Sequence, residues 1–205
     1  MESPILKTEY DLLDRASIRQ HMRKMRNQLS PQQQLQAARS LSQIVFTQPW
    51  FQRAHNIALY LANDGEMDPI VVMEKARYRG KHILLPCLHP TKSGHLCFAD
   101  YSGPTIKNKF GIIEPDPKRN TQIAAKQLDV VFMPLVAFDE NGGRLGMGGG
   151  FYDRTFEFLK QSGFNKPKLI GLAHEFQKVA TLPIETWDVP LDGIITEKSS
   201  YTVKR

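Results

Sequence analysis

The stretch LDVVFMPLVAFDENGGRLGMGGGFYDRTF, residues 128–156, decides the fold of this chain. Its opening part, residues 128–138, is a nearly continuous apolar run rich in valine and phenylalanine, which predicts a strand buried on both faces. Residues 139–143 (DENGG) combine the residue types that favour a tight turn. The helical pattern of residues 151–161 then ends near Gly163, a residue type that often terminates helices. This order of strand, turn and helix is typical of α/β proteins.

Segments on both sides of this stretch continue the alternation of strands and helices. Short apolar runs predict strands at residues 56–62, 81–88, 96–101, 168–173 and 193–196. Helices are predicted at residues 9–29, from Pro31 onward, and between Pro69 and Gly80. Ser30 and Gln33 carry the pattern of a capping box at the start of the second helix. We expect residues 102–120, which contain three prolines, to form a long ordered loop.

The alternation predicts an α/β fold with a mostly parallel central sheet flanked by helices. No internal repeat, low-complexity segment or linker divides the sequence. Residues 10–205 are therefore expected to form a single α/β domain, preceded by a flexible N-terminus at residues 1–9.

The composition is that of an ordinary globular protein, with 41% hydrophobic and 23% charged residues. The 27 basic and 21 acidic residues give a formal charge of +6, which attracts anionic partners in general. The densest basic cluster comprises Arg15, Arg19, Arg23, Lys24 and Arg26, spread along the first predicted helix. For most of these side chains we expect a solvated helix face.

The two cysteines, Cys87 and Cys97, lack metal-ligand spacing. Both can lie on paired strands, although two isolated cysteines in a chain of this size are more often buried apolar residues. Their scarcity favours a reduced, intracellular compartment. No apolar run is long enough to span a membrane, and the N-terminus lacks a signal-peptide core. The sequence therefore predicts a cytoplasmic protein with no membrane partner.

A cluster of glycines lies between the predicted strand and the predicted helix. It consists of Gly142, Gly143, Gly146, Gly148, Gly149 and Gly150. Glycine allows close approach of the backbone to a ligand, and a helix N-terminus directs N–H donors to one point, so the cluster predicts a phosphate-binding loop. It is neither a Walker loop, which ends in Gly-Lys-Ser/Thr, nor a G-x-G-x-x-G dinucleotide loop. The alternative is a flexible hairpin loop without a ligand.

Two charged residues flank the glycines. Arg144 supplies a planar cation that suits phosphate oxygens. Asp153 lies one turn into the predicted helix, where a magnesium ion can bridge its carboxylate to phosphates. We expect both residues to be catalytic.

The segment RLGMGGGFYDR, residues 144–154, resembles the most specific motif of the 5-formyltetrahydrofolate cyclo-ligase family, also called methenyltetrahydrofolate synthetases. Further segments agree in order and spacing, namely the basic helix with Arg15 and Arg19 and residues 61–66, 110–115, 130–138 and 187–196. The resemblance thus covers about residues 15–196. It implies a fold similar to the sugar-isomerase and CoA-transferase-like folds.

The resemblance implies ATP and Mg²⁺ as cofactors and a reduced folate as the small-molecule substrate. The ATP site would comprise Arg15, Arg19, Arg144, Leu145, Gly146, Met147, Gly148, Gly149, Gly150, Phe151 and Tyr152. The substrate site would comprise Leu61, Glu66, Met147, Gly148, Gly149, Gly150 and Phe151. Asp153 and Asp188 match the family's magnesium ligands. Phe110 and Glu114 are further candidates for the substrate pocket, and a place for Glu114 or Asp192 in the site stays open.

The implied reaction is the ATP-dependent closure of 5-formyltetrahydrofolate to 5,10-methenyltetrahydrofolate by a monomer or weak oligomer. The sequence departs mildly from the family pattern, with Arg15 where lysine is common and Phe151 where tyrosine is usual. One alternative is an ATP-dependent ligase or phosphoryl-transfer enzyme of the same scaffold that acts on another substrate. The other is a basic nucleic-acid-binding module, against which stand the dispersed charges and the lack of an aromatic-interleaved basic stripe.

Overall fold

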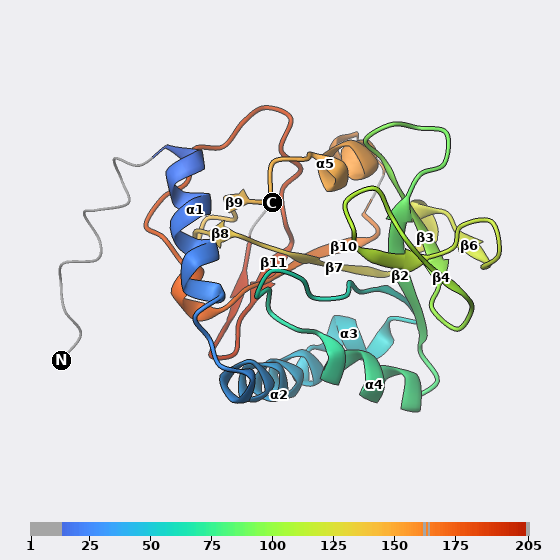
Figure 1. Ribbon diagram of the computed structural model, residues 1–205, viewed down its shortest axis with the longest axis horizontal. Coiled ribbons are helices and arrows are strands. Elements are labelled where there is room, and N and C mark those ends of the chain that lie inside the picture. The colour runs from blue at the N-terminus through green and yellow to red at the C-terminus, as the bar shows by residue number, and fades with distance from the viewer. Residues whose placement is uncertain (1–13, 162, 164, 204–205) are drawn as a thin grey trace.

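The computed structural model describes residues 14–161, 163 and 165–203. The strands of the main sheet are β1 (Asn56–Ala58), β2 (His82–Leu88), β3 (Leu96–Asp100), β6 (Gln122–Ile123), β7 (Val130–Pro134), β10 (Lys168–Leu172), β11 (Gly193–Ile195) and β12 (Ser200–Thr202). Within these ranges they form one eight-stranded sheet in the order β12-β11-β10-β7-β1-β2-β3-β6 (Figure 1). The strands from β11 to β2 are parallel, and antiparallel strands lie at both edges. The predicted α/β fold with a mostly parallel sheet is confirmed.

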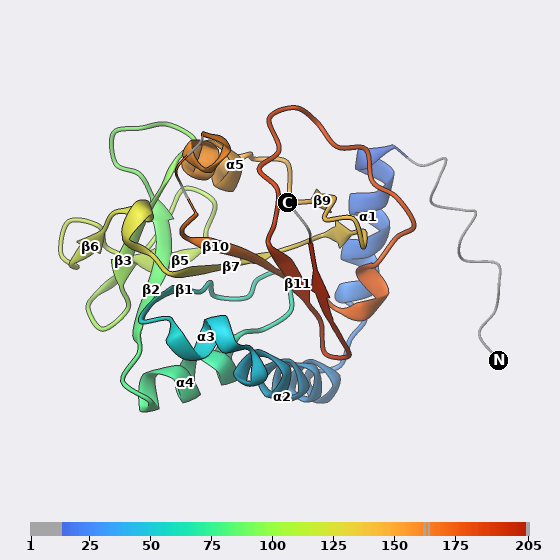
Figure 2. The ribbon, with the colours of Figure 1, turned by 180° about the vertical axis from the view of Figure 1, so that it is seen from behind.

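Helices cover both faces of the sheet. α2 (Pro31–Thr47), α3 (Pro49–Arg53) and α4 (Ile70–Tyr78) lie together on one face, and α5 (Phe151–Phe156) lies on the opposite face (Figures 1 and 2). Three 3₁₀ turns are named η2 (Ala125–Gln127), η3 (Glu157–Lys160) and η4 (Glu175–Gln177). Buried side chains fill both interfaces, for example Phe51 against Phe132 on one face and Phe156 against Phe98 on the other. Burial of this apolar area supplies the main drive for folding.

Helix α1 (Arg15–Arg26) lies beside the end of the sheet and packs Ile18 and Met22 on a third buried cluster. It is shorter than the predicted helix at residues 9–29. The carboxylate of Asp14 caps it by accepting hydrogen bonds from the backbone N–H groups of Ala16 (2.7 Å) and Ser17 (2.8 Å). The part of the prediction before Asp14, including the flexible segment at residues 1–9, lies outside the described residues.

Other predicted helix ends agree with the structure. Ser30 and Gln33 form the predicted capping box at the start of α2. Gly80 follows α4 with a φ of 72°, which is the left-handed conformation expected at a helix end. The predicted helix at residues 151–161 consists of α5 followed by the tighter turn η3. These features depend on neighbouring residues only.

The apolar run at residues 128–138 is not one strand, as predicted, but two. The backbone N–H of Leu135 still donates to the Leu172 carbonyl of the main sheet (3.2 Å). The next N–H, of Val136, instead donates to the carbonyl of Leu145 (2.7 Å). The chain therefore changes partner directly after β7, and β8 (Ala137–Phe138) pairs with β9 (Arg144–Leu145) in a separate two-stranded ribbon. This ribbon presents the glycine-rich loop that follows it.

Residues 102–120 are also more regular than predicted. They contain an antiparallel hairpin of β4 (Thr105–Lys107) and β5 (Ile113–Pro115). The side chain of Asn108 closes the turn, because its Oδ1 accepts hydrogen bonds from the N–H groups of Phe110 (2.9 Å) and Ile112 (3.1 Å). The hairpin projects from the sheet beside β2.

Cys87 and Cys97 lie opposite each other on the paired strands β2 and β3 and form a disulfide. Both are buried, so the structure shows the placement on paired strands as well as the burial that the sequence suggested. The disulfide differs from the reduced cysteines that their scarcity favoured. Across the described ranges, no helix combines the length and apolar character that crossing a bilayer requires.

Candidate active site

A cavity of about 730 Å³ opens at the carboxyl ends of the parallel strands β1, β2 and β7. Leu61, Leu88 and Leu135, which end or follow these strands, line its floor. Ligands of open α/β sheets bind at this edge, because the loops that leave the strands converge there. The glycine-rich loop, helix α1 and the hairpin β4–β5 complete the walls.

The glycine-rich loop lines the cavity from Gly146 to Gly150. Gly148 has a φ of 92° and Gly150 a φ of 62°, conformations that L-residues with side chains rarely adopt. Gly150 occupies the cap position directly before α5. A Cβ at Gly149 would lie 2.8 Å from the ring of Phe151, so the loop has no room for a side chain there. These glycines keep the backbone itself at the cavity wall.

Arg144 and Asp153 meet at the base of this loop. The guanidinium of Arg144 donates hydrogen bonds to the Asp153 carboxylate and to the Val189 carbonyl. The backbone N–H of Val189 donates to the same carboxylate (3.1 Å). Burial lowers the pKa of Arg144, and the nearby carboxylates of Asp153 and Asp188 act against that shift. Both side chains also line the cavity. Their hydrogen bonds hold the pair in place before any ligand binds.

Asp188 lines the cavity next to Asp153. Its Oδ2 accepts a hydrogen bond from the backbone N–H of Glu185 (3.0 Å) and lies 3.6 Å from the Arg15 guanidinium. Among the described residues, no group of three or more His, Cys, Asp or Glu side chains could hold a metal ion by itself. Two carboxylates fit a magnesium ion that takes its other ligands from phosphates and water, which is the usual arrangement in phosphoryl-transfer sites.

Two arginines of α1 contact loops at the cavity wall. Nε of Arg19 donates to the Gly146 carbonyl (2.8 Å), and Arg15 donates to the Pro183 carbonyl (3.3 Å). Burial and the nearby charge of Arg15 lower the pKa of Arg19. Both side chains line the cavity, Arg19 against the glycine-rich loop and Arg15 against the loop at residues 183–188. The predicted solvated helix face is wrong for Arg26, because this residue has no exposed surface.

The opposite end of the cavity carries Leu61 and Glu66. Oε2 of Glu66 accepts a hydrogen bond from the backbone N–H of Asn63 (3.1 Å). Burial raises the pKa of Glu66 to about 7, since the charged carboxylate loses hydration there. A poorly hydrated carboxylate gains more than a solvated one from N–H donors on a ligand.

The hairpin β4–β5 forms the apolar rim. The rings of Phe110 and Phe151 lie 5.9 Å apart and nearly perpendicular, both at the cavity. Glu114 also enters the site, where its carboxylate accepts hydrogen bonds from the N–H of Leu88 (3.1 Å) and the side chain of Asn108 (2.9 Å). Asp192 lies outside the cavity lining, and its Oδ2 accepts from the backbone of β10.

All the predicted site residues except Leu145 line this one cavity. The side chain of Leu145 is buried in the cluster beneath α1 and does not line the cavity. Three further residues that line the cavity with Glu66 were not predicted from the sequence, namely Tyr60, Asn63 and Asp64. The only local signal was the NDG turn that follows the first apolar run.

The comparisons with known proteins agree with this geometry. The model of the "5-formyltetrahydrofolate cyclo-ligase family" matches residues 12–197. The chain belongs to this family. Among curated relatives, the 5-formyltetrahydrofolate cyclo-ligase of Escherichia coli K12 is 40% identical over 85% of this chain and 96% of that protein. That of Haemophilus influenzae is 41% identical over 88% of this chain and 96% of that protein.

A solved family structure has the same fold. The Aquifex aeolicus 5,10-methenyltetrahydrofolate synthetase superposes with a TM-score of 0.77 at 26% identity, covering 93% of each chain. The family resemblance predicted from residues 144–154 is therefore confirmed, and the chain is an enzyme of the cyclo-ligase class.

Proposed function

We propose that the enzyme uses ATP and Mg²⁺ to convert 5-formyltetrahydrofolate to 5,10-methenyltetrahydrofolate, with release of ADP and phosphate. One observation carries the proposal: a single cavity joins a glycine-rich loop, three arginines and the magnesium candidates Asp153 and Asp188 to an apolar aromatic rim with the half-buried Glu66. The first half suits a triphosphate with magnesium, and the second suits a flat ring that bears N–H groups. The names of the curated relatives point to the same substrate.

The chemistry follows from the substrate. The formyl oxygen on N5 attacks the γ-phosphorus of ATP, and the bond to the ADP oxygen breaks. The formyl carbon becomes electrophilic, and the N10 lone pair attacks it to close the five-membered ring. N10 loses its proton, the C–O bond breaks, and inorganic phosphate leaves with the electron pair. The product is a conjugated amidinium cation.

The residues of the cavity suit these steps through positioning and charge. Phosphoryl transfer needs neutralisation of the phosphate charge more than it needs a covalent nucleophile. Arg15, Arg19 and Arg144 would supply cations, and residues 146–150 would supply backbone donors. Asp153 and Asp188 would hold magnesium, which neutralises charge on the phosphate oxygens when bound. No step requires a nucleophilic Ser or Cys.

On the substrate side, the Glu66 carboxylate would accept hydrogen bonds from the N–H groups of the pterin ring. Leu61 and Phe151 would pack on the ring, and Phe110 would close the rim above it. Because the glycine-rich loop lies between the two halves, residues 147–150 would contact both the γ-phosphate and the formyl group. This placement brings the two reacting groups together.

The test is a coupled assay with purified protein, ATP, Mg²⁺ and 5-formyltetrahydrofolate. We expect near-ultraviolet absorbance of the cyclic product to grow together with one ADP per turnover. ADP formation without product, or product only from a different formyl compound, would instead support the alternative of the same scaffold with another substrate. Absence of both signals would refute the proposal.

A further inference from the structure

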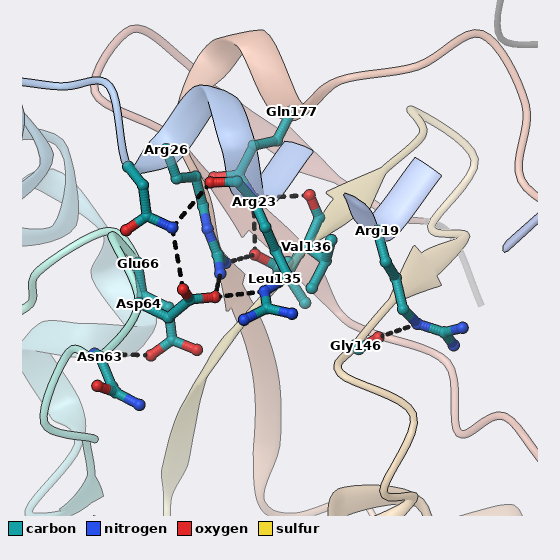
Figure 3. Close-up of polar contacts among 11 residues, drawn as sticks. Arg19, Arg23, Arg26, Asn63, Asp64, Glu66, Leu135, Val136, Gly146 and Gln177 are labelled. Carbon is teal, nitrogen blue, oxygen red and sulfur yellow. Dashed lines mark hydrogen bonds and ion pairs between the residues drawn. The ribbon is translucent and has the colours of Figure 1, made fainter. Parts of the chain in front are cut away.

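Arg26 is a fully buried arginine at the end of α1 that no part of the proposed mechanism uses. It has no exposed surface and does not line the cavity. Its Nη2 donates to the Asp64 carboxylate (2.9 Å), and its Nη1 donates to the Leu135 carbonyl (3.2 Å) (Figure 3). Its Nε is buried without a hydrogen-bond partner among the described residues. Burying a charged side chain costs several kcal/mol, and an apolar side chain would fill the same space without that cost.

Asp64 connects Arg26 to the cavity. Its carboxylate accepts three donors from α1 and its C-cap, namely Nε of Arg23 (2.6 Å), Nη2 of Arg26 (2.9 Å) and Nδ2 of Asn27 (2.9 Å). Asp64 itself has a φ of 52°, which is unfavourable for a residue with a side chain. Arg26 is fully buried in its ion pair with Asp64, so this pair fastens the strained turn to the helix, whereas the pair with the exposed Arg23 contributes little.

The turn also touches Arg26 directly. Gly65 has a φ of 70°, and a Cβ there would lie 2.8 Å from the Arg26 carbonyl carbon. Glu66, the next residue, accepts its hydrogen bond from Asn63 within the same turn. The position of the Glu66 carboxylate in the cavity thus depends on how the turn is fastened to α1.

We propose that Arg26 is a positioning residue of the reduced-folate site, which fastens the turn at residues 63–66 through Asp64 and places a buried positive charge near Glu66. This inference rests on the proposed function, in which Glu66 accepts N–H groups of the pterin ring. In Figure 3, Asp64 lies between the guanidinium of Arg26 and the carboxylate of Glu66. The fixed cation favours the anionic form of Glu66, which is the form that accepts hydrogen bonds.

The charges around Glu66 make the electrostatic part testable. Burial has the largest effect on the pKa of Glu66 and raises it, and the charge of Asp64 raises it further. The hydrogen bond from the Asn63 N–H and the charge of Arg26 lower it. Among the described residues, the phenols of Tyr60 and Tyr152 also interact electrostatically with Glu66. Their pKa values are raised by burial, so both stay neutral near pH 7.

The experiment compares wild type, R26M, R26K, D64N and R23M by steady-state kinetics against pH. R26M should raise the KM for the reduced folate about tenfold while the KM for ATP changes less than about twofold. The acidic limb, which is the fall of kcat/KM for the folate at low pH, should also move to a pH about one unit higher, because Glu66 loses the nearby positive charge. R26K should return the limb to its wild-type pH, because lysine keeps the positive charge, but it should restore the folate KM only in part.

D64N separates positioning from a general structural role. It should raise the folate KM as well, but move the acidic limb to lower pH, because Glu66 loses a neighbouring negative charge. Arg23 is the matched control, since it donates to the same Asp64 oxygen from an exposed position. R23M should keep both KM values within about threefold of wild type and leave the limb unmoved.

Thermal melts accompany each assay. If R26M does not fold, the KM and limb shifts of R26K and D64N decide the question. The inference would be overturned if R26M and D64N had folate KM values within twofold of wild type, or if their acidic pH limbs stayed in place. An active wild type would leave the proposed function intact in that case. Lack of product from the wild type would instead refute the proposed function itself.

Discussion

Gly148 offers the sharpest test of the phosphate-binding loop, because its backbone conformation has a matched control elsewhere in the chain. Gly148 has a φ of 92° and Gly163 a φ of 95°. A Cβ at Gly148 would lie 3.6 Å from the Arg19 guanidinium, whereas a Cβ at Gly163 would meet no atom within 4 Å. Alanine therefore introduces the same backbone strain at both positions, but obstructs the cavity only at Gly148.

The strain gives the expected stability change. An L-residue in the left-handed region costs about 1–2 kcal/mol, and for a chain of this size about 2–4 °C of Tm is lost per kcal/mol. Gly148→Ala and Gly163→Ala should both lower Tm by roughly 2–8 °C. Differential scanning fluorimetry measures this directly. Similar losses of Tm in the two variants would establish that both substitutions introduce the same backbone strain.

Nucleotide affinity should separate the two variants. The new methyl group at position 148 would enter the space between the loop and Arg19, where a phosphate would lie. Loss of one hydrogen bond to a charged phosphate costs about 1.5–3 kcal/mol, which corresponds to about a tenfold to hundredfold weaker Kd for ATP. Gly163→Ala should bind ATP as the wild type does.

Isothermal titration calorimetry with ATP and Mg²⁺ gives the Kd values, and adenosine serves as the ligand without phosphates. The two variants should bind adenosine alike, since the methyl group obstructs only the phosphate position. If Gly148→Ala binds ATP within twofold of Gly163→Ala, the loop does not hold phosphates and the assignment of residues 146–150 is wrong.

Three further predictions concern the charged residues of the cavity. Arg144→Ala should lower kcat by about a hundredfold and also lower Tm, because its removal takes a donor from the Val189 carbonyl and leaves the Asp153 carboxylate with the Val189 N–H alone; kinetics and a melt check both. Asp188→Asn should raise the Mg²⁺ concentration for half-maximal activity about tenfold with little change in Tm, and an unchanged magnesium titration would contradict a ligand role. For the wild type, kcat/KM for the folate should fall as pH drops through about 7, where Glu66 becomes protonated, and a Glu66→Gln variant should lose this limb.

Features that depend on neighbouring residues could be predicted from the sequence. The capping box of Ser30 and Gln33 needs only the first turn of its helix, and the glycine-rich loop needs only the residues between a strand and a helix. The glycines are required because Gly148 and Gly150 adopt positive φ and a Cβ at Gly149 would strike Phe151. Local sequence thus carries both the position and the reason for the loop.

Features that depend on distant partners could not be predicted. Residues 128–138 read as one strand because their apolar pattern does not change at Pro134. The break arises because the backbone N–H of Val136 donates to Leu145 and not to the strand that contains Leu172. Leu145 follows a turn and Leu172 is remote in the sequence, so neither partner can be recognised from the run itself. The cysteines gave the same ambiguity, since only the register of two strands decides whether two buried thiols meet.

The basic cluster of α1 shows most clearly how local charge misleads. Arg15, Arg19, Arg23 and Arg26 recur at helical spacing, so they share one side of the helix, and a row of arginines alone suggests a solvated face. In the fold this side meets carboxylates and carbonyls of loops far along the chain, with Asp64 and Asp188 as the acidic partners. A charge is stabilised inside a protein only by partners that the tertiary structure brings to it. The helix can therefore bury one arginine and direct two others into the cavity only because those loops leave the same edge of the sheet.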